Sequence, residues 1–382
     1  MRKSADALSQ AGHDVMVLYA HNTAWADQAD KPILEGAKWS HVRVGGSPNT
    51  QRLRFHWGRV ERKLHDLTGN SRRAFCRGYR EYVRLGKQRR PDLLIGHNPG
   101  ALGPLVTLAN TLRVPALFDA EDFHRGEQQE GSKASKDVAR LENELLPYVD
   151  ALTAASPLIA AEYRALFPTK VVTDISNAFS IRYASEEPKL RASEEPLRLV
   201  WFSQVIGTDR GLVEFIEGMN GAANVPIEFS IVGQCASPMR ESLRGVVESE
   251  FHHLTFLEPM NEDFLFNELS KHDLGLALEG NDSFNRQICE TNKLYSYPLA
   301  GCGALISSTS GQRHFLDKHP DVGLPIDLQN SKNIADTLKR LHENRLELLS
   351  LREGAWTKAH SILNWEKESA KLVQLVEQML EA

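Results

Sequence analysis

The sequence of 382 residues has few cysteines and no long apolar run. Its four cysteines are widely spaced and form no CxxC pair, which argues against a zinc site or a disulfide framework and favours a reducing cytoplasm. No run approaches the ~20 apolar residues that cross a bilayer. The N-terminal sequence Met1-Arg2-Lys3-Ser4 leads into a polar helix rather than a signal peptide. We therefore expect a cytoplasmic protein.

Acidic residues are scarce in one region. Residues 51–90 hold 13 Lys or Arg against 3 Asp or Glu, a local charge of +10, which leaves −15 for the rest at a net charge of −5. Apolar residues such as Trp57 interleave with this region's cations, which include Arg72, Arg73 and Arg77. The pattern favours docking on an anionic membrane surface, and a solvated helical face is the alternative. Overall acidity and the lack of a nucleic-acid-binding module argue against nucleic acid.

Apolar strands such as Ala116–Phe118 alternate with amphipathic helices along the chain. This pattern predicts an α/β protein with parallel sheets covered on both faces, and the length fits two domains. We expect two Rossmann-like, doubly wound domains over 1–183 and 197–363. The sequence ASEEPKLRASEEP at 184–196 is typical of a solvated linker. Ligands of such sheets bind outside the carboxyl ends of the strands.

The chain starts inside a helix, whereas a doubly wound domain normally begins with a strand and a glycine-rich loop. We expect the first strand of the N-terminal domain to be missing, either from this form of the chain or because the start codon is assigned too far downstream.

The segment HDLGLALEGNDSFNRQICETNKLYSYPLAGCGALISS, from His272 to Ser308, combines a buried strand, a short helix entered at Lys293 and a Gly-Cys-Gly turn. Unpaired backbone N–H groups at a turn and at a helix N-terminus attract anions, and Lys293 adds a full positive charge. This arrangement predicts a phosphate site. The alternative is an ordinary glycine-punctuated βαβ unit.

Arg210 lies between the first strand of the second domain and a helix expected from Gly211. A guanidinium group at such a turn suits a diphosphate, because its fork matches phosphate oxygens. The alternative is a helix-capping loop in which Asp209 pairs with Arg210.

Polar residues also follow the strands of the first domain. The sequence FDAEDFHRGE places Asp119, Glu121, Asp122 and His124 after a buried strand, as general base catalysis or hydroxyl binding would require. Their spacing matches no common metal-ligand set. A polar loop that caps a helix is the alternative. Three more polar residues end neighbouring strands and should reach the same sheet edge: His97, Asn98 and Asn177.

Several segments resemble retaining glycosyltransferases of family four, also called group one, which have the GT-B fold. ALSQAGHDVMVLYA, ALTAASPLIAAEY and ISNAF resemble parts of the acceptor-side domain, and LRLVWFSQVIGTDRGL, EFSIVGQ and LTFLEPM resemble the start of the donor domain. The block GLALE…TNK…Y…AG is the closest likeness. LNWEKESAKLVQLVEQML resembles the final helix, which implies that 364–382 packs back on the first domain.

The resemblance implies a glycosyltransferase that moves a sugar from a nucleotide-sugar donor to a hydroxyl of a glycan or lipid-linked acceptor, in bacterial polysaccharide or glycoconjugate synthesis. It implies a retaining, metal-independent reaction without a cofactor. The basic stretch 51–90 separately predicts a peripheral position at the inner face of the membrane. Arg210 and Lys293 would neutralise the leaving diphosphate, and Asp122 and His124 would orient the acceptor. The donor-binding candidates are Gly207, Arg210, Gly233, Glu279, Glu290, Asn292, Lys293 and Gly301, and the acceptor-binding candidates are His97, Asn98, Asp119, Glu121 and Asn177.

The sequence departs from the family at positions that matter for the donor. The paired glutamates of the family fall at Ile288 and Ser296, and the usual Gly-Arg turn reads Ser203-Gln204. Two other functions therefore stay open, a sugar-nucleotide epimerase and a non-catalytic relative that binds glycans or a partner transferase.

Overall fold

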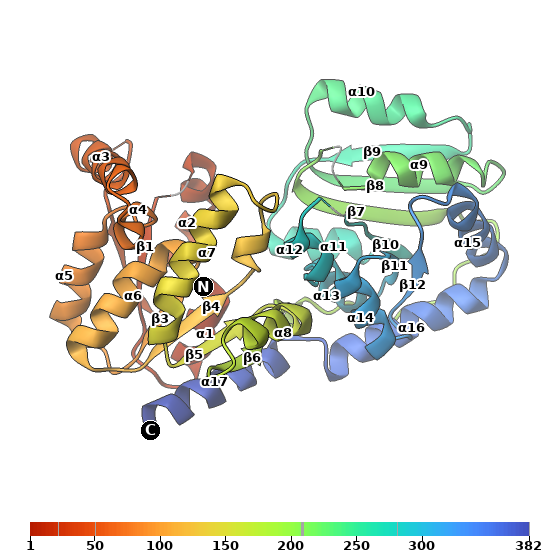
Figure 1. Cartoon of the computed structure of the whole chain (residues 1–382). Helices are drawn as coiled ribbons and strands as arrows, with labels where there is room; N and C mark the ends of the chain where they lie inside the picture. Colours follow the sequence, from red (N-terminus) through yellow and green to blue (C-terminus); the bar gives the residue numbers. More distant parts are fainter. Residues whose placement is uncertain (22, 50, 208–209, 281, 382) are drawn as a thin grey trace. The chain divides into compact units, whose positions relative to one another are not determined.

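The computed structural model describes residues 1–381 except 22, 50, 208, 209 and 281. The chain divides into two compact units, one of Met1–Ile175 with Ser369–Ala382 and one of Ser176–Glu368 (Figure 1). Each unit contains parallel strands connected through helices, so the prediction of two Rossmann-like α/β domains is confirmed. Among the described residues, no helix is both long and apolar enough to cross a bilayer.

The strands of the first unit form a parallel sheet of order β3-β4-β5-β6 and a separate parallel pair, β1-β2. The strands are β1 (Met16–Ala20), β2 (Ser40–Val44), β3 (Leu94–His97), β4 (Ala116–Ala120), β5 (Ala151–Ala154) and β6 (Val171–Asp174). The helices are α1 (Arg2–Gln10), α2 (Ala24–Glu35), α3 (Arg52–Leu67), α4 (Ser71–Ala74), α5 (Tyr79–Arg89), α6 (Pro99–Leu112), α7 (Lys133–Leu145) and α8 (Pro157–Leu166), with 3₁₀ turns η1 (His124–Gly126) and η2 (Leu146–Tyr148).

The last helix, α17 (Trp365–Glu381), begins in the second unit and continues into the first from Ser369. Its side chains Leu372, Leu375 and Val376 are buried in a cluster with Leu117 of β4 and Leu8 of α1. Burying apolar side chains of this size stabilises by roughly 1.5–3 kcal/mol each, so this helix is an integral part of the first unit's core.

The second unit contains one parallel sheet of order β12-β11-β10-β7-β8-β9. Its strands are β7 (Leu197–Val205), β8 (Ile227–Gln234), β9 (His252–Leu257), β10 (Leu274–Ala277), β11 (Gly303–Ser307) and β12 (Gly323–Ile326). Its helices are α9 (Leu212–Asn220), α10 (Ser237–Val246), α11 (Glu262–Leu269), α12 (Phe284–Ile288), α13 (Lys293–Leu299), α14 (Ser310–Lys318), α15 (Ser331–Glu343) and α16 (Arg345–Ser361), with the 3₁₀ turn η3 (Ile181–Tyr183).

Alternate residues of β7 supply the two faces of this sheet. Leu199 and Trp201 enter one hydrophobic cluster with α9 and α15, whereas Val200 enters another with α11, α13 and α16. Successive side chains of a strand point to opposite faces, so an apolar strand needs helices on both. This is the physical reason for the doubly wound architecture that the sequence predicts.

Residues 184–196, the expected linker, lie within the second unit. The Ser185 amide donates to the Leu299 carbonyl at 3.0 Å, and the Trp356 indole donates to the Ser185 carbonyl at 3.0 Å. Arg191 donates to the buried Asp273 carboxylate at 2.5 Å, and Arg352 approaches the same carboxylate at 3.3 Å. These contacts fix residues 184–196 to the rest of the second unit, although their composition is typical of a solvated linker.

Other elements differ from the predictions. The single stretch expected over Lys332–Ala359 is two helices, because Asn344 interrupts it and its side chain accepts from the Glu347 amide at 3.1 Å to cap α16. The sequence did not indicate β2 or α2, since β2 is a five-residue strand with two exposed polar residues and α2 contains Pro32, which usually interrupts a helix.

Candidate functional site

The central feature of the second unit is a carboxylate shared by two cations. Glu279 follows β10, Arg210 follows β7 and Lys293 begins α13. Arg210 Nη1 lies 3.1 Å from Glu279 Oε1, and Lys293 Nζ lies 3.4 Å from the same oxygen. The two residues that the sequence analysis assigned to the diphosphate thus meet at the carboxyl edge of the sheet. Asp209, the alternative partner of Arg210, lies outside the described residues.

Burial makes this cluster electrostatically strong. Lys293 and Glu279 are each 5% exposed, and the Lys293 ammonium lies 5.4 Å from the centroid of the Trp201 ring. Burial lowers the pKa of Lys293, the neighbouring Glu279 carboxylate opposes that change, and the charge of Arg210 reinforces it. Charges interact more strongly where water is excluded, so this site is suited to an anionic ligand that shares the two cations with Glu279.

The glycine turn and Lys293 lie at opposite ends of α13, so the structure does not bring them into one anion site. Gly301 has φ +74°, which favours glycine, and its carbonyl accepts from Arg352 Nε at 3.1 Å. A side chain there would meet Ser185 at 2.7 Å. With only seven residues, α13 also has a small dipole, so the positive charge at its start comes from Lys293.

The remaining donor-binding candidates are spread over the unit. Gly233 is the penultimate residue of β8, where its missing side chain admits the Ser203 carbonyl, and Gly207 follows β7. Glu290 is buried and accepts a hydrogen bond from Tyr295, and Asn292 is the exposed cap of α13. The donor-binding role of all four stays a prediction.

The first unit contains a polar row across three neighbouring strands. His97, Asp119 and Thr153 are register partners on β3, β4 and β5. His97 Nδ1 lies 2.8 Å from Asp119 Oδ2, and the Thr153 hydroxyl donates to Asp119 Oδ1 at 2.6 Å. Because register partners in a sheet share a face, the strand pairing alone brings these groups together.

The hydrogen bonds of this row change the pKa of Asp119. Burial would raise the pKa of Asp119, but the hydrogen bonds from His97 and Thr153 outweigh it and lower the pKa below its usual value. An ionised carboxylate can only accept hydrogen bonds, so His97 Nδ1–H is the donor in this contact and Nε2 points away from it. Thr153 was missed in the sequence, although a hydroxyl inside the apolar strand ALTA is a readable signal.

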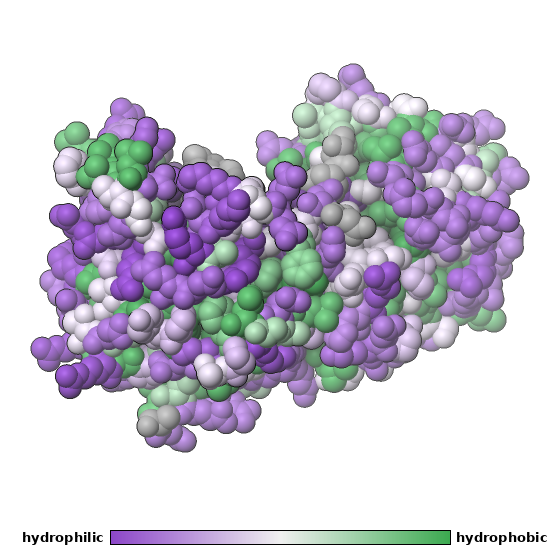
Figure 2. Space-filling model, in the orientation of Figure 1, coloured by the Kyte–Doolittle hydropathy of each residue, from purple (hydrophilic) through white to green (hydrophobic). Residues whose placement is uncertain are grey.

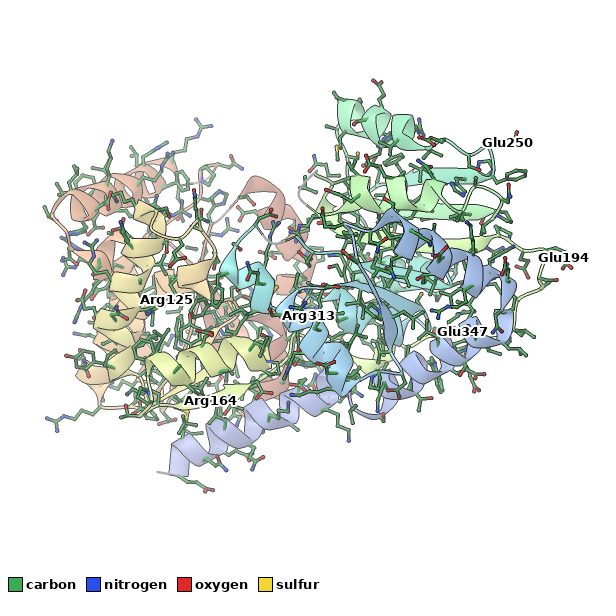
Figure 3. All side chains as sticks on the ribbon, turned by 45° about the vertical axis from the view of Figure 1, so that its right-hand side comes forward. Arg125, Arg164, Glu194, Glu250, Arg313 and Glu347 are labelled. Atoms are coloured by element: carbon green, nitrogen blue, oxygen red, sulfur yellow. The ribbon has the colours of Figure 1, made fainter. Side chains whose placement is uncertain are left out.

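The loop after β4 places its polar residues in two environments. His124 is 3% exposed and its Nδ1 lies 2.5 Å from Glu127 Oε1. The adjacent Arg125, labelled in Figure 3, bonds to the buried Glu142 at 2.5 Å. Burial alone would lower the pKa of His124, but the Glu127 carboxylate raises it overall. These contacts hold the His124 ring in place, and its predicted role in orienting the acceptor stays a prediction.

Asp122 is partly buried beside His124, whereas Glu121 is exposed. Asn98 is exposed as well and has φ +66° at the start of α6. Asn177, expected to end the first domain, belongs to the second unit. The roles of these residues in acceptor binding stay predictions.

Comparisons with known proteins address the family. Residues 1–177 match the family described as "Glycosyl transferase 4-like domain". The match identifies the first unit as a glycosyltransferase 4-like domain. No curated protein sequence matches it significantly.

Solved structures show the fold of the whole chain. HepE of Anabaena, solved with UDP-glucose, is 14% identical with a TM-score of 0.65, over 95% of this chain and 99% of HepE. MurG of Acinetobacter baumannii is 15% identical with a TM-score of 0.52, over 98% and 94%. MnaA of S. aureus, solved with UDP, is 11% identical with a TM-score of 0.55, over 96% and 97%. These likenesses confirm the GT-B fold that the sequence predicts.

Proposed function

We propose that this glycosyltransferase moves a sugar from a nucleotide-sugar donor to a hydroxyl of a glycan or lipid-linked acceptor, in bacterial polysaccharide or glycoconjugate synthesis. The observation that carries this proposal is the convergence of Arg210 and Lys293 on Glu279. HepE and MnaA, which share the fold, were solved with UDP or a UDP-sugar, so UDP is the first nucleotide to test.

In the proposed reaction, Arg210 and Lys293 stabilise the negative charge that develops on the leaving diphosphate. Preorganised charges of this kind supply the largest single contribution to many enzymatic rates. Glu279 holds both cations in position before the donor arrives, so they need not reorganise when the ligand binds.

On the acceptor side, we propose that His97 binds the acceptor hydroxyl through Nε2 and that Asp119 fixes the orientation of the ring. The 2.8 Å contact between the two side chains supports this role. Replacing Asp119 by Asn should then raise the KM for the acceptor more than the KM for the donor.

Calorimetry with UDP tests the proposed donor site. We expect Arg210→Ala and Lys293→Ala each to weaken UDP binding on the order of 10- to 100-fold, as loss of a charged hydrogen bond at a buried site does. Arg340→Ala is the matched control, because Arg340 forms an exposed pair with Glu347 in the same unit. Unchanged UDP affinity in both site variants would reject the assignment.

Activity assays test the stereochemistry and the metal dependence of the proposed reaction, and the two alternative functions. We propose a retaining, metal-independent reaction without a cofactor, so transfer should survive EDTA and the product should keep the anomeric configuration of the donor by NMR. An epimerase would instead convert the UDP-sugar without any acceptor. Binding of UDP without transfer or hydrolysis would identify a non-catalytic relative.

We also propose that the enzyme is cytoplasmic and associates peripherally with the inner face of the membrane. The excess of cations in residues 51–90 supports an anionic lipid surface as its partner.

A further inference from the structure

Helix α3 exposes a continuous row of large apolar side chains. The row, here called the α3 stripe, recurs at alternating intervals of four and three residues. At about 100° per residue, these positions fall within an arc of about 80°. The fractional exposures are 90% for Leu53, 70% for Trp57, 60% for Val60, 57% for Leu64 and 76% for Leu67. Apolar spheres accordingly gather over α3 at the upper left of Figure 2.

The opposite side of α3 is fixed to the first unit. Phe55 and Gly58 are buried, and the Arg77 guanidinium lies 4.7 Å from the centroid of the Phe55 ring. The side chain of Arg77 also packs against Gly58. Phe55 lies about 160° around the helix from the middle of the stripe. The stripe therefore cannot turn inward unless these contacts break.

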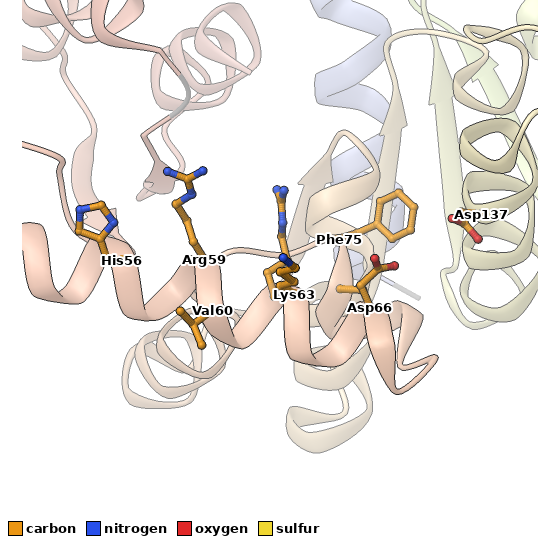
Figure 4. A pocket seen from close by; sticks show the side chains of 9 residues that line it. His56, Arg59, Val60, Lys63, Asp66, Phe75 and Asp137 are labelled. Atoms are coloured by element: carbon orange, nitrogen blue, oxygen red, sulfur yellow. The ribbon is translucent and has the colours of Figure 1, made fainter.

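A pocket of about 650 Å³ adjoins α3 and is lined by cations and by Val60 of the stripe (Figure 4). Arg59, Arg62 and Lys63 line it and are exposed, and no hydrogen bond or ion pair involves them within the described part of the chain. In Figure 4, His56 and Arg59 point to one side of α3 and Val60 to the other. The pocket thus presents positive charge next to the apolar row.

The two acidic residues of this pocket do not neutralise those cations. Asp137 lies 2.6 Å from Lys133 and 3.0 Å from Arg140, so its charge is already paired. Asp66 is exposed, and the Lys133 ammonium lies 3.9 Å away.

The arginines expected from the sequence to face the membrane have other partners. Arg72 pairs with Glu144 at 2.8 Å, and the Arg73 guanidinium lies over the Tyr79 ring at 5.1 Å. Arg77 lies over Phe55, as described above. The exposed cations of α3 are therefore better placed than these three to meet lipid.

We propose that α3 lies flat on an anionic bilayer, with the α3 stripe at the boundary between headgroups and acyl chains. Lys63 and Arg59, about 80° and 120° around the helix from the middle of the stripe, then contact lipid phosphates. An exposed apolar face bordered by cations is what interfacial helices require. A second copy of the chain fits less well, since pairing two such helices would bring like charges together. This inference specifies the proposed membrane association and rests on it, but it requires no catalytic activity.

Sedimentation with vesicles tests it on the full chain without donor. The vesicles contain equal parts of phosphatidylglycerol and phosphatidylcholine, or phosphatidylcholine alone. We expect the wild type to prefer the anionic vesicles at least roughly tenfold. Trp57→Glu with Leu64→Glu should abolish binding, and Arg59→Gln with Lys63→Gln should remove the anionic preference.

Two controls match these variants. Phe264→Glu changes a side chain that is 67% exposed in the second unit, and Arg84→Gln with Lys87→Gln removes exposed cations from α5. Both should bind like the wild type. Anionic vesicles should also shift the tryptophan emission to the blue in the wild type, and Trp57→Phe should reduce that shift.

Two outcomes with vesicles would overturn the inference: a wild type without preference for anionic vesicles, or a stripe variant that binds them normally. A third would be a wild type that does not bind vesicles but self-associates in ultracentrifugation, when the stripe variant does not self-associate. Donor binding by calorimetry is measured on the same variants. Lost vesicle binding with intact UDP affinity therefore separates this surface from the proposed donor site.

Discussion

Two groups of cations in this protein differ in their electrostatic surroundings. Arg210 and Lys293 share a carboxylate, and Lys293 is almost fully buried. The cations of the α3 pocket are exposed and have no internal partner in the described residues. A buried charge is tolerated only when it is paired, whereas an exposed one is solvated by water. The first group should therefore select ligands by geometry and the second by charge density.

The largest loss of stability is expected at a buried carboxylate that pairs with two cations and lies outside the proposed donor site, where UDP cannot take its place. Asp273 is fully buried between Arg191 and Arg352. Asp273→Asn should lower the free energy of unfolding by about 3–5 kcal/mol, the usual loss when one partner of a buried pair is removed. Guanidinium titration measures it. UDP should not restore the loss beyond its effect on the wild type, and a stability change below 1 kcal/mol would contradict the account.

A smaller loss of stability, which UDP should partly restore, is expected when Glu279 is replaced. Glu279→Gln leaves Lys293 without its charged partner, but Arg210 retains some solvent contact, so we expect a loss of about 2–3 kcal/mol. UDP supplies negative charge to the same two cations and should raise the melting temperature of this variant more than that of the wild type. Glu347→Gln is the control. If UDP raises the melting temperature of Glu279→Gln and of the wild type equally, Glu279 is not part of the donor site.

Salt should distinguish the two groups of cations directly. Raising NaCl from about 0.05 to 0.3 M shortens the screening length to below ~10 Å. We expect vesicle binding to fall on the order of tenfold and UDP affinity to change several-fold less, because buried charges are screened less. If vesicle affinity and UDP affinity depend equally on salt, the two groups of cations do not differ in their exposure to solvent as described.

The smallest predicted effect is a pH dependence at His124. Because the pKa of His124 is raised above 6.5 in the folded state, its pairing with Glu127 stabilises fully below pH 6.5, and this contribution is lost as pH rises through the raised value. Glu127 is 39% exposed, so solvent screens the pair, and a change in melting temperature of only about 1 °C is expected. Glu127→Gln should remove that component of the curve of melting temperature against pH.

Much of the fold follows from local patterns. Apolar strands separated by amphipathic helices predict the parallel sheets, because each such strand must bury both faces. Arg210 and Lys293 could be proposed for one site because both follow strands of the second sheet. Glu279 was foreseen only as a donor contact, and its pairing with both cations depends on distances between segments far apart in the chain.

Other features depend on contacts that no local pattern encodes. The acidic, proline-containing segment 184–196 is typical of a linker, yet Asp273 and Arg352 hold it to the second unit. Gly301 resembles part of a phosphate turn, but it lies at the far end of α13 and packs against Ser185.

The sequence by itself determined the α/β class, the family resemblance and the basic character of residues 51–90, because composition and periodicity are local properties of the chain. Only the tertiary structure decided which cations are paired and which are free to meet a ligand. The reason is physical: a charge is neutralised by whatever lies within a few ångströms, and strand pairing and helix packing alone determine those neighbours.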